Sequence, residues 1–276
     1  MGDVESLGAE LEEHRATLPP RSGHPDRVRA PGSGGEPTGQ APWPIAAQPH
    51  GAAVRTATSA RTLTVYAPGQ IVVLNGAPRS GKSSIAAAMQ DRLDGVWMNL
   101  GVDTFTGATP ERYRPGVGLR PGGERPDLEA IVPALYEAMY GSVVAHSRLG
   151  LDVVVDVGHH DAYAAPLGIL PRVASQLAGL PALLVGVRCP IDVIMQRRDA
   201  GQPGRRARYA TTASDGTVPE AVVRWQREVH RPGIYDLEVD TSVMNPAACA
   251  EAIGRRLRDG PPPSAFERLA RLAGPT

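Results

Sequence analysis

The sequence has few of the features that mark secreted and membrane-bound proteins. It holds two cysteines, Cys189 and Cys249, which cannot build a disulfide framework. No stretch approaches the roughly 20 apolar residues of a membrane span. The acidic N-terminus lacks the basic-then-apolar pattern of a signal peptide. We therefore expect a cytoplasmic protein with no membrane partner.

The chain also carries no formal net charge. The 29 basic and 29 acidic side chains cancel, which removes the global field typical of proteins that bind nucleic acid, so we expect no nucleic-acid partner. The basic residues are uneven, because 28 are arginine and only one, Lys82, is lysine. This single lysine is therefore a candidate for a specific chemical task.

Glycine and proline are abundant, and they divide the chain. Together they make up 21% of the 276 residues, whereas roughly 12% is ordinary. Residues 1–60 hold 16 of them and show no sustained apolar periodicity, so we expect a disordered Pro/Gly-rich N-terminal extension there. The rest has the size of one domain, for which we expect a body at 61–260 and a tail at 261–276 with a short helix.

From residue 61 onward, short apolar segments alternate with amphipathic ones. The apolar segments predict five strands, at 71–75, 96–100, 152–156, 183–188 and 237–240. The amphipathic segments predict helices at 83–93, 128–147, 167–180 (broken near Pro171), 191–198, 219–230 and 246–258, with a loop at 106–126. Continuously apolar strands separated by helices predict a three-layer α/β fold, in which a five-stranded parallel sheet has helices on both faces.

The most specific motif is a phosphate-binding loop. Residues 76–83 fit G-x-x-x-x-G-K-[ST] at every fixed position and lie between a predicted strand and a predicted helix. Glycines let successive backbone N–H groups point at phosphate oxygens, beside the positive N-terminus of the helix. The predicted nucleotide-binding residues are Gly76, Ala77, Pro78, Arg79, Ser80, Gly81, Lys82, Ser83 and Ser84. Within this set, Lys82 is expected to contact the β- and γ-phosphates, and Ser83 to ligate Mg²⁺.

Two aspartates follow predicted strands, where an open parallel sheet binds its ligands. Asp103 is a candidate base for a substrate hydroxyl that attacks the γ-phosphorus, with a helix N-cap as the alternative. Asp156 is a candidate Mg²⁺ ligand together with Ser83, with a structural hydrogen bond to the P-loop as the alternative. We interpret His159 and His160 as substrate-lining or structural loop residues rather than a metal site.

Arginines gather after the fourth predicted strand. Five of them, interrupted by glycine and proline, are Arg197, Arg198, Arg205, Arg206 and Arg208. Such a segment suits a lid, at about 199–217, that closes over a triphosphate, excludes water and neutralises developing charge. The alternative is a solvated surface loop.

Taken together, these motifs resemble the chloramphenicol phosphotransferase family of P-loop kinases. The resemblance runs from about 71 to 252 and rests on the P-loop, on 101–103, on the strand ending at Asp156, and on segments 185–189, 229–230 and 235–241. It implies an adenylate-kinase-like fold with a small lid, and ATP with Mg²⁺ as cofactors. It also implies Asp103 as the catalytic aspartate, and Arg205 and Arg208 as lid arginines that act beside Lys82.

The predicted function is therefore that of an ATP-dependent O-phosphotransferase. It would move the γ-phosphoryl group of ATP to a hydroxyl of a small molecule, and the resemblance implies an antibiotic acceptor and a role in resistance. Residues 157–160 and 211–217 depart from the family's pattern, so a kinase for a sugar or another metabolite stays open, as does an ATP-binding regulatory module. The sequence carries no signal for an oligomeric state.

Overall fold

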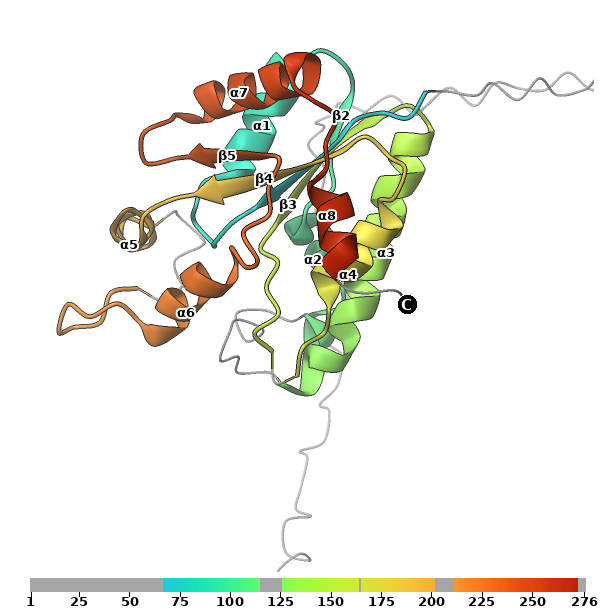
Figure 1. Ribbon diagram of the computed structural model, residues 1–276. Helices are drawn as coiled ribbons and strands as arrows, with labels where there is room; N and C mark the ends of the chain where they lie inside the picture. Colours follow the sequence, from blue (N-terminus) through green and yellow to red (C-terminus); the bar gives the residue numbers. More distant parts are fainter. Residues whose placement is uncertain (1–66, 115–125, 164, 202–210, 273–276) are drawn as a thin grey trace, which may run out of the picture. The chain divides into compact units, whose positions relative to one another are not determined.

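The computed structural model describes residues 67–114, 126–163, 165–201 and 211–272 (Figure 1). The chain divides into two units, Met1–Ala60 and Arg61–Thr276, and every described residue belongs to the second unit. The extension predicted at 1–60 and the lid arginines predicted at 205 and 208 lie outside the described residues. Within the described part, no helix is both long enough and apolar enough to cross a membrane.

A parallel sheet forms the centre of the second unit. Its five strands are β1 (Ile71–Asn75), β2 (Trp97–Asn99), β3 (Asp152–Val157), β4 (Ala182–Arg188) and β5 (Leu237–Asp240), in the order β2-β3-β1-β4-β5. All neighbouring strands are parallel, and Ile71 at the start of β1 pairs with Val153 on one side and Ala182 on the other. The predicted five-stranded parallel sheet is thus confirmed. Since parallel strands share a direction, their carboxyl ends meet at one edge of the sheet.

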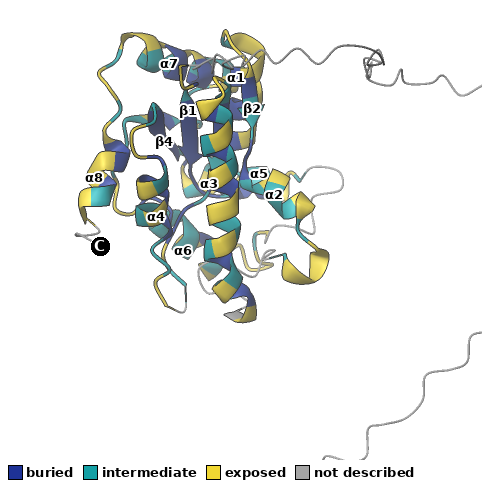
Figure 2. Cartoon of the chain, turned by 90° about the vertical axis from the view of Figure 1, so that its right-hand side faces the viewer, coloured by how far each residue is buried: buried dark blue, intermediate teal, exposed yellow. Residues whose placement is uncertain are grey.

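Helices cover both faces of this sheet, as predicted. Val72 and Leu74 point to a core under α1 (Lys82–Arg92) and α7 (Pro246–Asp259). Ile71 and Val73 point to the opposite core, under α3 (Val132–Arg148), α4 (Ile169–Gln176) and α8 (Ala265–Leu272). The alternation follows from the two-residue period of a strand. In Figure 2 the strands are buried between helices whose outer faces are exposed.

The elements at the carboxyl edge of the sheet build the candidate site. They are α2 (Val102–Ala108), α5 (Ile191–Asp199) and α6 (Glu220–Glu228), with short 3₁₀ turns at Glu111–Tyr113 and Pro126–Ile131. A third buried cluster joins Ala77 of the P-loop to Cys189, to Ile194 of α5 and to Val222 of α6. Helices α5 and α6 therefore share one buried cluster with the P-loop.

Three local predictions differ from the structure. The loop predicted at 106–126 begins inside helix α2, which starts at Val102. The helix predicted at 128–147 starts as a 3₁₀ turn and becomes α-helical only at Val132. Pro171 does not break α4, because it lies in the first turn, where a missing backbone N–H removes no helical hydrogen bond. The short helix predicted in the tail is α8, and its Phe266 belongs to the core.

Candidate active site

The P-loop lies between β1 and α1 and is shaped by close backbone approach. A Cβ on Gly76 would lie 2.5 Å from the carbonyl oxygen of Val187, so only glycine fits there. Gly81 caps α1 with a φ of 97°, a conformation that favours glycine, and no side chain caps the helix. The N-terminal N–H groups of α1 therefore point to a site where phosphate oxygens can accept hydrogen bonds.

Lys82 and Ser83 meet Asp156 at the end of β3. Ser83 Oγ donates to Asp156 Oδ2 at 2.5 Å, and Lys82 Nζ lies 3.6 Å from Asp156 Oδ1. The Lys82 side chain is almost entirely buried, and its Nζ also donates to the carbonyl of Ala77 at 3.0 Å. The structure thus brings together the two residues predicted to hold Mg²⁺ and the lysine predicted to contact phosphate.

A cavity of about 190 Å³ lies beside this trio, and its walls carry oxygen ligands. Its described lining is Ser83, Asn99, Gly101, Asp103, Thr104 and Asp156. Carboxylate, hydroxyl and amide oxygens are the donors that Mg²⁺ prefers, and with a nucleotide it also takes phosphate oxygens and water. The residues therefore fit Mg²⁺ bound with a triphosphate. No group of three or more His, Cys, Asp or Glu placed to hold a metal occurs in the described ranges.

Asp103 lies in the first turn of α2, on the border between two cavities. The N-cap of α2 is Gly101, so the alternative of Asp103 as the N-cap is not what the structure has. A Cβ on Gly101 would be 2.9 Å from the Cβ of Asp156, which means that α2 starts in direct contact with β3. Asp103 lines the 190 Å³ cavity and also a larger one of about 250 Å³.

The larger cavity runs from the P-loop to an aromatic end. At the phosphate end it is lined by Gly76, Pro78, Lys82, Ser83 and Asp156. The remaining described lining is mostly apolar or aromatic and comprises Val102, Asp103, Phe105, Thr106, Thr109, Val132, Leu135, Tyr136, Met139, Val157, Gly158, His160, Tyr163 and Trp225. Burial raises the pKa of Tyr136 to about 12 and that of Tyr163 further, so both phenols are neutral at physiological pH. Of the described lining residues, only Lys82, Asp103 and Asp156 are Lys, Arg, Asp or Glu.

The two histidines after β3 occupy different surroundings. His159 is buried behind the cavity, where its Nε2 pairs with the Tyr140 hydroxyl at 2.7 Å. His160 lines the cavity, with its ring stacked on Tyr163 at 4.4 Å and edge-on to Trp225 at 4.8 Å between centroids. The structure thus places His159 in a buried hydrogen bond and His160 in the cavity wall.

The outer side of the P-loop is fixed by α5 and by the turn after β5. Arg197 donates to the hydroxyl and the carbonyl of Thr241, at 3.0 and 2.7 Å. The Thr241 hydroxyl donates to the carbonyl of Ser80 at 2.7 Å, and the guanidinium of Arg79 donates to the carbonyl of Arg197. Arg197, included with the lid arginines on sequence grounds, thus supports the loop from outside. The neighbouring Arg198 is buried.

The remaining predicted nucleotide-binding residues lie in this loop or at the start of α1. Ala77 is buried, Pro78 lines the larger cavity, and Ser84 is exposed in the first turn of α1. The sequence did not single out Tyr136, Tyr163 and Trp225 as residues that line the larger cavity. An aromatic residue in an amphipathic helix or a loop is equally compatible with a place in the hydrophobic core. Nor did the sequence single out Asn75, whose signal was a polar residue at the end of an apolar strand.

Comparison with known proteins identifies the family of this chain. Residues 69–258 match the family described as chloramphenicol phosphotransferase-like protein, which is well over half of the chain. The chain belongs to the chloramphenicol phosphotransferase-like family. The match includes the P-loop, Asp103 and Asp156, and the coarse activity that follows is that of a kinase-type phosphotransferase.

Individual relatives of this family member are distant. A candidate O-phosphotransferase of Mycobacterium tuberculosis (strain H37Rv) is 24% identical over 213 residues, which cover 73% of this chain and 88% of that protein. Among solved structures, the APS kinase of Mycobacterium tuberculosis, in complex with AMPPNP and APS, is 18% identical with a TM-score of 0.46 and covers 67% of this chain and 95% of that one. The Deinococcus radiodurans tunicamycin resistance protein is 19% identical with a TM-score of 0.43, covering 69% and 96%.

Proposed function

We propose that the protein is an ATP-dependent O-phosphotransferase that phosphorylates a hydroxyl of a small, uncharged molecule. The observation that carries this proposal is the position of Asp103. Its carboxylate borders both the oxygen-lined cavity beside Ser83 and Asp156 and the larger cavity with the aromatic end. A base in that position can reach an acceptor hydroxyl from one side while the γ-phosphate lies on the other.

The chain's own residues supply the parts of an in-line transfer. The acceptor oxygen attacks the γ-phosphorus, its proton passes to a carboxylate oxygen of Asp103, and the bond from phosphorus to the β,γ-bridging oxygen breaks to release ADP. Backbone N–H groups of the P-loop bind the phosphates, and Lys82 exchanges its contacts with Ala77 and Asp156 for phosphate oxygens. Mg²⁺, held by Ser83 and Asp156, would supply neutralisation of phosphate charge.

The lining of the aromatic end favours an apolar acceptor over a sugar or polyol. Each buried hydroxyl of a polyol needs a polar partner, since an unpaired buried polar group costs roughly 1–3 kcal/mol. Away from Asp103, the described polar groups of this end are two threonines, two neutral tyrosines, His160 and Trp225. An uncharged acceptor whose aromatic ring stacks among these rings fits better, and chloramphenicol, with its nitrophenyl ring, is one such compound. Inactivation of an antibiotic is the biological role that this proposal implies.

The proposal is tested by phosphoryl transfer from γ-labelled ATP across a panel of hydroxyl compounds. The panel contains chloramphenicol, other apolar aromatic alcohols, and sugars and sugar alcohols as the contrasting class. We expect transfer to members of the aromatic set. Asp103→Asn should lower kcat by about 100-fold or more, because general-base catalysis contributes 10²–10⁴-fold, with ATP affinity nearly retained.

A matched variant separates a chemical effect from a general loss of charge. Asp91 is an exposed aspartate of α1, so Asp91→Asn removes the same carboxylate without touching either cavity. Its turnover should equal that of the unchanged protein. Full turnover in Asp103→Asn would rule out Asp103 as the base. ATP binding without transfer to any compound of the panel would instead favour the ATP-binding regulatory module.

A further inference from the structure

Asn75 ends β1 immediately before the P-loop, and the transfer chemistry above does not use it. The residue is 2% exposed. Its Oδ1 accepts from the backbone N–H of His159 at 2.7 Å, and its Nδ2 donates to the Val229 carbonyl at 2.8 Å and to the Tyr235 hydroxyl at 3.1 Å. Because an N–H can only donate and a carbonyl can only accept, these partners fix the orientation of the amide.

Two partners of Asn75, His159 and Val229, lie in or next to segments that contribute to the aromatic end of the cavity. His159 lies in the loop that places Gly158 and His160 in the cavity wall. Val229 follows the last residue of α6, and its N–H donates to the carbonyl of Trp225 at 2.9 Å. The amide of Asn75 therefore holds both the loop after β3 and the last turn of the helix that carries Trp225.

These two segments also contact each other beside the start of the P-loop. The rings of His160 and Trp225 meet edge to face, with centroids 4.8 Å apart. A Cβ on Gly158 would lie 3.2 Å from the carbonyl oxygen of Gly76 and 3.4 Å from the Trp225 ring, so the three segments pack closely around Gly158. Asn75 is not among the described residues that line the cavity, and so it acts through these neighbours.

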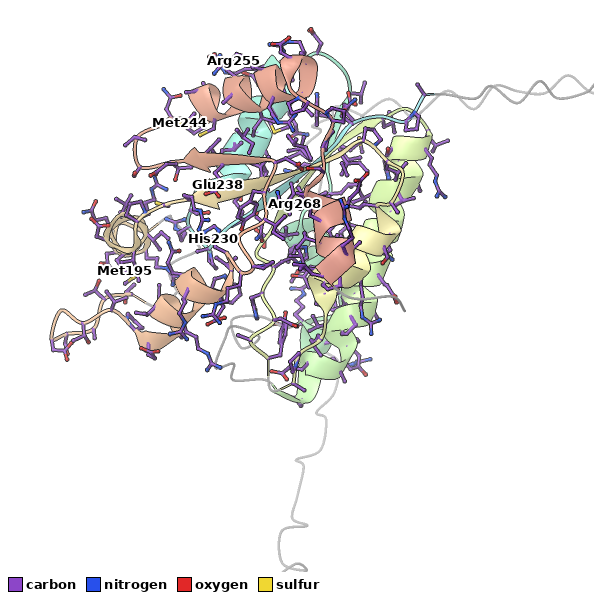
Figure 3. The ribbon with its side chains drawn as sticks, in the orientation of Figure 1. Met195, His230, Glu238, Met244, Arg255 and Arg268 are labelled. Carbon is purple, nitrogen blue, oxygen red and sulfur yellow. The ribbon has the colours of Figure 1, made fainter. Side chains whose placement is uncertain are left out.

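Tyr235 extends the same network to the strands. Its hydroxyl pairs with His230 Nδ1 at 2.9 Å, and a Cβ on Gly186 of β4 would lie 2.8 Å from its ring. Burial, followed by the positive charge of Arg188, lowers the pKa of His230 to about 4, so the imidazole is neutral and can accept from Tyr235. His230, labelled in Figure 3, lies between α6 and β4 and joins the end of this helix to the sheet.

We infer that Asn75 is a positioning residue for the phosphoryl acceptor. It holds the loop at 157–163 and helix α6 in fixed positions relative to the P-loop, and so sets the separation between the acceptor hydroxyl and the γ-phosphate. This inference rests on the proposed function. Reacting groups must sit about 3–3.5 Å apart, and a misplacement of about 1 Å can cost 10²-fold in rate. Phosphate binding depends on the P-loop backbone, Lys82 and Ser83, and should change little.

The kinetic test compares Asn75→Leu with Ser147→Ala. Leucine has a similar size and makes none of the three hydrogen bonds. Ser147 is equally buried and its hydroxyl donates to the Gly69 carbonyl at 2.7 Å, next to the amino end of β1, away from the cavity. With the panel acceptor of highest turnover, we expect Asn75→Leu to raise the acceptor KM about tenfold and lower kcat, while the Kd for AMPPNP stays within about threefold. Ser147→Ala should leave both constants unchanged.

Amide hydrogen exchange supplies a readout that needs no acceptor. In Asn75→Leu, exchange at the His159 amide and in the last turn of α6 should rise about tenfold or more, with α1 unchanged. Asn75→Asp serves if leucine prevents folding. Its carboxylate still accepts from the His159 amide but no longer donates to Val229, so only the end of α6 should exchange faster.

The outcomes separate this inference from the proposed function. Faster exchange confined to the two segments supports the positioning role even where no panel compound is phosphorylated, a result that would overturn the proposed function alone. Unchanged exchange in these segments overturns the positioning role. Equal losses of acceptor and AMPPNP affinity, or the same KM rise in Ser147→Ala, would reduce Asn75 to a general structural residue.

Discussion

At the residue scale, His159 shows how burial fixes the charge of a side chain near the site. Its ring is enclosed by Tyr136 and Tyr140, with His160 next in the chain. Burial, helped by the proximity of His160, lowers the pKa of His159 to about 3. The imidazole is therefore neutral under all conditions in which the enzyme is expected to work, and it serves as a hydrogen-bond partner of Tyr140 rather than as a proton carrier.

We predict that this histidine makes the protein less stable in acid. The pKa of His159 is about 3 in the folded state and about 6.5 when unfolded, so between these values the unfolded chain binds the extra proton. Its contribution is fully present above pH 6.5 and is lost as the pH falls, by about 2 kcal/mol at pH 5. His230, with a pKa of about 4, acts in the same direction.

The measurement is urea unfolding at pH 7 and pH 5 for the unchanged protein and for His159→Gln. Glutamine can still form a hydrogen bond with Tyr140 but does not titrate. The variant should therefore lose about 2 kcal/mol less than the unchanged protein between the two pH values. An identical loss in both proteins would show that His159 is not buried as a neutral group.

At the element scale, the start of α2 determines the position of Asp103 relative to Asp156. Gly101 lets the helix begin against β3, since a Cβ there would lie 2.9–3.0 Å from the Cβ, N and O atoms of Asp156. Gly101→Ala should therefore displace either α2 or the carboxylate of Asp156. We expect a loss of about 1–3 kcal/mol in stability, from forced overpacking, and a lower kcat.

Gly107 provides the control within the same helix. Within the described part of the chain, no atom outside its own turn of helix lies within 4 Å of a Cβ built there. Gly107→Ala should keep the activity and stabilise the protein by about 0.5–1 kcal/mol, the usual gain of alanine over glycine within a helix. Equal stability and turnover in Gly101→Ala and Gly107→Ala would contradict a tight contact between α2 and β3. Both are measured by thermal unfolding and by transfer assays.

The sequence predicted the elements whose signal is local and missed those that depend on partners. All five strands were predictable from their short apolar segments, as was the P-loop, because Gly81, Lys82 and Ser83 sit at fixed spacing. Helix α2 was not, since its seven residues include Gly107 and none is buried, so that contacts with neighbouring elements hold it. The proximity of Asp103 and Asp156 could be expected, because both follow predicted strands of a parallel sheet. The aromatic end and the Asn75 network could not, because they combine segments up to 160 residues apart.

At the scale of the whole molecule, the residues of the candidate site fall within the second unit. The family match begins at residue 69, and the three buried clusters consist of residues from 71 onward. Because the family match starts after residues 1–60, we expect these residues to have no part in the proposed transfer. The other end of the chain differs, because Ala265, Phe266 and Leu269 of α8 are buried in the core beside α4.

Two terminal truncations therefore should have opposite results. A protein that starts at residue 61 should keep its Tm within about 3 °C and its kcat within about twofold, because it retains the whole second unit. A protein that ends at Ser264 exposes the core under α8, and losing the burial of Phe266 and Leu269 should cost roughly 3–6 kcal/mol. Calorimetry and the transfer assay measure both. A protein starting at 61 that folds but transfers no phosphate would assign residues 1–60 to catalysis or its regulation, since folding would then be excluded as the cause.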